Sequence, residues 1–110
     1  MAREPLFRGS GVALVTPFDD AGVNGSALGA IVRFHLEEGT DALVVNGSTG
    51  EAATMSPEEQ RTAVEVVVAE TGGRVPVIVG CGGSDTAAVA KLARAAREAG
   101  ADALLLSAPP

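Results

Sequence analysis

Short apolar runs alternate with longer segments of helical periodicity along the whole chain. Four runs rich in Val, Leu, Ile and Ala fit buried strands, at residues 12–16, 42–46, 75–80 and 103–107. Between them, apolar residues recur every three or four positions, which is the spacing of one helix face. Strands separated by such helices need crossover connections, so the pattern predicts a parallel α/β sheet of about four strands and three helices.

Polar residues at the ends of the helical segments predict where each helix begins. Ser56 precedes Pro57 and stands three residues before Glu59, which is typical of a helix N-terminus because the serine and glutamate side chains can each accept a backbone N–H there. This helix is expected to end at the glycine pair 72–73. Residues 19–25 are expected to form a loop. The other two helices have two candidate caps each: Asn24 or Ser26, and Ser84 or Asp85.

An internal repeat supports this alternation of helix and strand. Residues Glu38–Leu43 recur in similar form as Ala99–Leu104, each with a glycine, one further residue and then Asp-Ala-Leu. The glycines stand where a helix can end in a left-handed residue, and Asp-Ala-Leu then opens an apolar run. The repeat indicates one βα unit used more than once.

A small, hydroxyl-rich turn follows the second apolar run. Gly47 and Gly50 allow close approach of the backbone to a ligand, and Ser48 and Thr49 between them add two hydroxyls and several amides. Such donors suit the carboxylate of a small oxo-acid. The same residues also fit an ordinary hydroxyl-capped turn from strand to helix. Glu51 is expected to accept hydrogen bonds from neighbouring loop amides rather than to act as a general base.

Composition narrows the classes of function. The 110 residues carry a formal net charge of −6 and only three aromatic residues, all Phe, so no cationic surface or base-stacking platform for nucleic acid is expected. No apolar run is long enough for a bilayer, which favours a cytoplasmic protein with no membrane partner. Cys81 and His35 are too few to build a structural metal site. His35 and Lys91 are expected to be structural residues on helices, and Cys81 to line a pocket.

Four segments in order along the chain carry a family resemblance: Val15–Phe18, Gly47–Glu51, Val75–Gly80 and Gly100–Ala103. Together they resemble the N-terminal part of the dihydrodipicolinate synthase / N-acetylneuraminate lyase family, over essentially the whole chain. The resemblance implies a (β/α)₈ TIM barrel, which needs about 250 residues. Residues 1–110 would then form one partial domain, the N-terminal half of the barrel.

The resemblance also implies a class I aldolase mechanism, in which a lysine amine forms an imine with pyruvate and the enamine attacks a small aldehyde. By position, Thr49 would hold the pyruvate carboxylate and Ser48 would relay a proton, with Gly47 and Gly50 completing the substrate-binding turn. No separate cofactor is implied. The family's imine-forming lysine and its relay tyrosines have no counterpart in this sequence, so the isolated chain is expected to be inactive. Family members are usually tetramers, which implies a homo-oligomer.

Three functions remain open at this point. The segment Ala53–Glu59 resembles the synthase branch, which condenses pyruvate with aspartate semialdehyde in lysine and diaminopimelate biosynthesis. Ser48 resembles the sialic-acid lyase branch, so the second candidate is a sugar-acid aldolase of the same family, either an N-acetylneuraminate lyase or a 2-keto-3-deoxy sugar-acid aldolase. From another class, the chain could be a non-catalytic half-barrel that associates with itself.

Overall fold

The computed structural model describes residues 3–107, so the last few residues at each end of the predicted 1–110 domain lie outside the described part. The elements follow one another in the order β1 (Gly11–Ala13), β2 (Phe18–Asp19), β3 (Gly22–Val23), α1 (Gly25–Glu37), β4 (Ala42–Val45), the 3₁₀ helix η1 (Ala52–Thr54), α2 (Pro57–Thr71), β5 (Val77–Cys81), α3 (Thr86–Glu98) and β6 (Ala103–Leu106).

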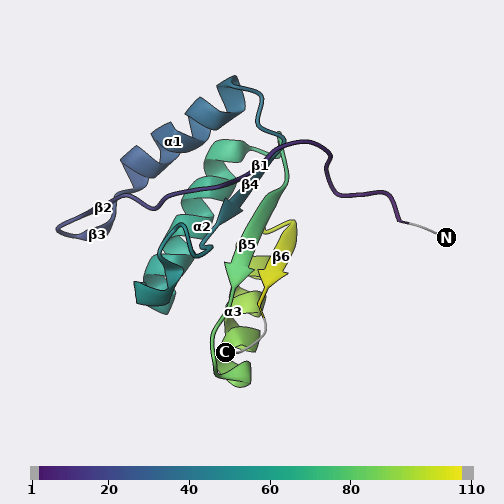
Figure 1. Ribbon diagram of the computed structural model, residues 1–110. Coiled ribbons are helices and arrows are strands. Elements are labelled where there is room, and N and C mark those ends of the chain that lie inside the picture. The colour runs from purple at the N-terminus through teal and green to yellow at the C-terminus, as the bar shows by residue number, and fades with distance from the viewer. Residues whose placement is uncertain (1–2, 108–110) are drawn as a thin grey trace.

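Strands β1, β4, β5 and β6 form one sheet in that spatial order, and every neighbouring pair is parallel. The helices that connect them pack side by side, α1 against α2 and α2 against α3. All three cover the same face of the sheet (Figure 1), as right-handed crossovers require. The predicted sheet of four parallel strands and three helices is confirmed.

The helix boundaries follow from their caps. Ser56 and Glu59 form the predicted capping box: the Ser56 hydroxyl accepts from the Glu59 amide at 3.1 Å, and the Glu59 carboxylate accepts from the Ser56 amide at 2.9 Å. Of the two candidates at each remaining helix, Asn24 caps α1 and Asp85 caps α3. Helix α2 ends at Gly72, which has a left-handed φ of 57°.

The two copies of the sequence repeat have the same structure. Gly39 and Gly100 both have positive φ, at 82° and 106°, and each ends a helix. The aspartates that follow then bind the neighbouring strand: Asp41 accepts from the Ser10 amide and Asp102 from the Val77 amide, both at 2.8 Å. The repeat is therefore a structural unit in which the aspartate joins the starts of adjacent parallel strands.

The two faces of the sheet differ in burial. Toward the helices, Leu43, Val45, Val77 and Val79 are buried in the core. The opposite face presents the alternate residues, among them Val44, Ile78 and Leu105, and Leu105 is 54% exposed. At the β6 edge, Leu106 is 62% exposed as well. An apolar sheet face and an apolar edge are thus without a partner among residues 3–107.

Two details of the first strand region differ from expectation. Strand β1 is shorter than predicted, because its partner β4 ends at Val45 and the last pairing bond runs from the Leu14 amide to the Val44 carbonyl. The predicted loop at 19–25 contains a small antiparallel hairpin, β2–β3. Its turn is closed by the Asp19 carboxylate, which accepts from the Ala21 amide at 2.8 Å, and by Gly22 at a φ of 119°. Within residues 3–107, no helix has both the length and the apolar character needed to cross a bilayer.

Candidate active site at the carboxyl ends of the strands

A cleft of about 490 Å³ lies where β4, β5 and β6 end. Parallel α/β sheets bind ligands at this end, because the loops that follow the strands converge there. The cleft is large enough for a small organic ligand. It is lined by the turn after β4, by the end of β5 with the loop that follows it, and by residues of α2 and β6: Asn46, Gly47, Ser48, Ala52, Ala53, Met55, Gln60, Gly80, Cys81, Gly82, Gly83, Leu105 and Ser107.

The turn after β4 leaves a compact set of donors unused. Its own carbonyls engage three amides: Gly50 N and Ala52 N donate to Gly47 O, and Glu51 N donates to Ser48 O. The amides and hydroxyls of Ser48 and Thr49 have no hydrogen-bond partner within the described chain, and both residues are exposed. Two neighbouring N–H groups and two hydroxyls are therefore available to an anion, as expected for a backbone nest.

The structure places the four predicted turn residues differently with respect to the cleft. Gly47 and Ser48 line it, whereas Thr49 lies beside Ser48 without bordering the cleft. Gly50 is buried, and a Cβ there would lie 3.0 Å from Thr16 Oγ1 and 3.1 Å from Leu14 O. Gly50 therefore allows the turn to pack on the end of β1. The roles of Ser48 and Thr49 toward pyruvate stay predictions.

The expectation for Glu51 is wrong. Its side chain is exposed, and its carboxylate accepts no hydrogen bond from a loop amide in the described chain. The Glu51 backbone is left-handed, with a φ of 62°, a conformation that the residue types of the turn do not reveal.

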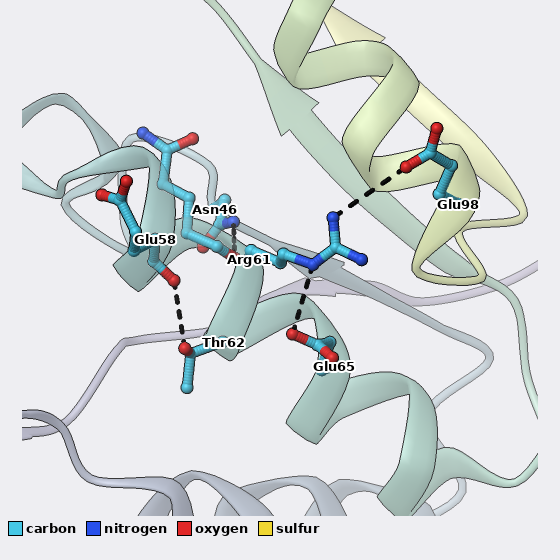
Figure 2. Close-up of polar contacts among 7 residues, drawn as sticks. Asn46, Glu58, Arg61, Thr62, Glu65 and Glu98 are labelled. Atoms are coloured by element: carbon cyan, nitrogen blue, oxygen red, sulfur yellow. Dashed lines mark hydrogen bonds and ion pairs between the residues drawn. The ribbon is translucent and has the colours of Figure 1, made fainter.

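Asn46 and Gly80 are site residues that the sequence reasoning missed. Asn46 is 4% exposed and has a left-handed φ of 59°. Its Nδ2 donates to the Gln60 carbonyl at 2.9 Å, which links the end of β4 to α2 (Figure 2). A Cβ on Gly80 would lie 2.8 Å from the Asn46 carbonyl carbon, so β5 approaches this backbone closely. The Asn-Gly pair at 46–47 was a usable signal, since asparagine tolerates left-handed backbone.

Cys81, His35 and Lys91 lie where the sequence predicted them, the cysteine in a pocket and the other two on helices. Cys81 is 2% exposed and lines the cleft, and burial raises the pKa of its thiol. His35 lies in the last turn of α1, with Nδ1 3.4 Å from Thr40 Oγ1, at the opposite end of the sheet from the cleft. Lys91 is exposed on α3. Within residues 3–107, no cluster of three His, Cys, Asp or Glu side chains is placed to hold a metal ion.

Parallel βα units whose strands lie side by side in chain order, with a cleft at their carboxyl ends, are the arrangement with which a (β/α)₈ barrel begins. Residues 6–109 match the dihydrodipicolinate synthetase family. The chain belongs to that family and forms the N-terminal part of its TIM barrel. The resemblance noted from the sequence is confirmed.

Individual relatives agree with this assignment. A 4-hydroxy-tetrahydrodipicolinate synthase from Thermoanaerobacter sp. (strain X514) is 50% identical over 105 residues, which are 96% of this chain and 35% of that protein. The dihydrodipicolinate synthase of Aquifex aeolicus matches with a TM-score of 0.89 at 44% identity, over 94% of this chain and 35% of that one.

A third relative is a chloride-inhibited dihydrodipicolinate synthase from Acinetobacter baumannii, solved in complex with pyruvate. It matches with a TM-score of 0.87 at 40% identity, over 92% of this chain and 35% of that one. This chain thus spans about a third of the length of the relatives it matches.

Proposed function

We propose that this chain supplies the pyruvate-binding turn of a pyruvate-dependent lyase of the 4-hydroxy-tetrahydrodipicolinate synthase type. The observation that carries the proposal is the set of unengaged amides and hydroxyls on Ser48 and Thr49, beside a cleft at the carboxyl end of β4. Such donors suit a small carboxylate. The synthase names of the relatives and the pyruvate complex of the Acinetobacter baumannii protein support this choice of substrate.

In the proposed reaction, the pyruvate carboxylate accepts hydrogen bonds from the amide and hydroxyl of Thr49. A lysine amine condenses with the ketone carbon to form an imine and releases water. The imine loses a proton from the adjacent methyl group to become an enamine, whose carbon attacks the aldehyde carbon of aspartate semialdehyde. The Ser48 hydroxyl passes a proton during these steps. Lys91, the single lysine in the sequence, is exposed on α3 and does not line the cleft. The amine must therefore come from another part of the complete enzyme.

A hybrid enzyme tests the proposal. Residues 1–110 replace the matching first third of the Thermoanaerobacter sp. synthase, so that the remaining barrel supplies the lysine and the relay groups. We expect the hybrid to condense pyruvate with aspartate semialdehyde and to give a pyruvyl adduct after borohydride reduction, detected by mass spectrometry. Turnover only with a sugar-acid substrate would instead support the aldolase alternative, and a folded hybrid that binds no pyruvate would contradict the proposal.

Substitutions in the hybrid enzyme distinguish the role of the Thr49 hydroxyl from that of the Ser48 hydroxyl. Thr49→Val removes a donor to a charged group, which costs about 1.5–3 kcal/mol of binding, roughly 10- to 150-fold in pyruvate affinity. Ser48→Ala is expected to lower kcat with a smaller effect on KM. Thr62→Val is the matched control, because Thr62 is exposed on α2 and its hydroxyl donates only to the Glu58 carbonyl. Kinetics of Thr49→Val equal to those of Thr62→Val would exclude the carboxylate role.

A further inference from the structure

Asn46 occupies the residue between β4 and the hydroxyl turn, in a conformation that few side chains adopt. Its φ of 59° lies in the left-handed region, where glycine and asparagine are the usual residues. The residue is 4% exposed, and its Oδ1 is buried without a hydrogen-bond partner in the described chain. An unpaired buried acceptor costs free energy. The cost of this unpaired oxygen directs attention to what the rest of the Asn46 side chain does.

The Asn46 amide instead joins the start of the turn to Gln60. Asn46 Nδ2 donates to the Gln60 carbonyl at 2.9 Å (Figure 2). The Gln60 side chain holds the other end of the same segment, since its Nε2 donates to the carbonyls of Ala52 at 3.0 Å and Met55 at 3.4 Å. One residue of α2 thus binds the chain on both sides of Ser48 and Thr49.

The helix that provides this attachment is itself well anchored. Its capping box at Ser56 and Glu59 lies one turn before Gln60. Ala63, Val64 and Val67 on the same helix are buried against the sheet. A hydrogen bond to α2 therefore connects the turn to one of the more rigid parts of the described chain.

We propose that Asn46 is a positioning residue for the pyruvate-binding turn, acting through its hydrogen bond to the Gln60 carbonyl. This inference rests on the proposed function. When the bond is lost, the turn samples other conformations and only a fraction of molecules present the Ser48 and Thr49 donors together. Apparent affinity for pyruvate then falls by that fraction, whereas bound pyruvate restores the productive arrangement. The signature is a raised KM for pyruvate at a nearly unchanged kcat.

Two variants of the hybrid enzyme remove the hydrogen bond from Asn46 to the Gln60 carbonyl. Asn46→Gly keeps the left-handed backbone but has no amide, and Asn46→Asp keeps the shape but, as a carboxylate, has no donor for the Gln60 carbonyl. Asn24→Gly is the matched control, because Asn24 caps α1 away from the cleft and glycine is a tolerated N-cap. We expect KM for pyruvate to rise about 2- to 12-fold in both Asn46 variants, the range for one lost hydrogen bond, with kcat within about twofold. Asn24→Gly should leave both parameters unchanged.

Hydrogen–deuterium exchange gives a readout that does not depend on turnover. Peptides covering residues 46–56 should exchange several-fold faster in Asn46→Gly and Asn46→Asp, with exchange in α1 unchanged. Unaltered KM and unaltered exchange in both variants would overturn the positioning role. Should the parent hybrid be folded but inactive, the proposed function fails, and the exchange of residues 46–56 alone decides the role of Asn46. If Asn46→Gly fails to fold, the same measurements on Asn46→Asp decide it.

Discussion

Gly80→Ala is the smallest change that should displace the candidate pyruvate-binding turn. Gly80 is buried near the end of β5, beside the backbone that leaves β4. A Cβ added there would lie 2.8 Å from the Asn46 carbonyl carbon, closer still to its oxygen, and 3.1 Å from Gly47 Cα. All of these atoms belong to the backbone. No side chain can rotate away to make room, so the turn or the strand must move.

The size of the effect follows from this geometry. Adding a methyl group to a packed site costs about 1–3 kcal/mol, and a clash with backbone belongs near the upper value. The hybrid has about 300 residues, because 105 residues are 35% of the relative. At that size 1 kcal/mol shifts the melting temperature by roughly 1.5 °C, so Gly80→Ala should lower it by roughly 3–5 °C. The displaced turn should also bind pyruvate more weakly, and KM should rise.

Thermal unfolding and steady-state kinetics of the hybrid enzyme measure both effects. Gly25→Ala is the matched control: it is the same chemical change at the first residue of α1, where a Cβ would lie 3.4 Å from Val66 Cγ2 in ordinary contact. Alanine also favours helix over glycine, so this control should melt at or slightly above the parent temperature. If Gly80→Ala melted within about 2 °C of the parent with an unchanged KM, the close approach of β5 to the turn would not constrain the site.

Two further predictions concern Cys81 and the isolated chain. Burial raises the pKa of the Cys81 thiol above its ordinary value of 9.0. The thiol therefore contributes its full share of stability below pH 9.0, and that share is lost as the pH rises through the folded-state pKa. The melting temperature of the hybrid should therefore fall more steeply above pH 9.0 than that of Cys81→Ala, and equal slopes would argue against a buried thiol. The isolated 110-residue chain should show no synthase turnover and should self-associate or aggregate, because among residues 3–107 the outer edges of β1 and β6 have no partner strand and nothing covers the sheet face at Val44, Ile78 and Leu105. Sedimentation velocity tests this, and a monodisperse monomer with a sharp unfolding transition would contradict it.

Much of the fold could be predicted because it depends on local physical rules. The capping box at Ser56 and Glu59 acts within four residues, and it specifies where α2 begins whatever the rest of the chain does. Gly39 and Gly100 end helices through their own left-handed backbone, and the repeated Asp-Ala-Leu marks the next strand. Apolar runs between such boundaries leave a parallel sheet as the consistent arrangement.

These local rules did not predict the hairpin β2–β3 or the exposure of the Glu51 side chain. Two-residue strands carry too little periodicity to be recognised, and closure of this hairpin depends on the Asp19 side chain and the φ of Gly22. For Glu51, the deciding fact was its left-handed backbone within the turn, which a list of residue types does not reveal.

In the candidate site, too, some features follow from the sequence and others from the tertiary structure. The sequence by itself determined that a small turn of glycines and hydroxyls follows a buried strand, since Gly47–Gly50 are contiguous and their chemistry is local. Only the tertiary structure brought Gln60 of α2 and Gly80 of β5 against Asn46, which directly precedes that turn. These residues meet because crossover connections place the carboxyl ends of parallel strands side by side, and contacts between residues so far apart in sequence depend on the packing of the whole sheet.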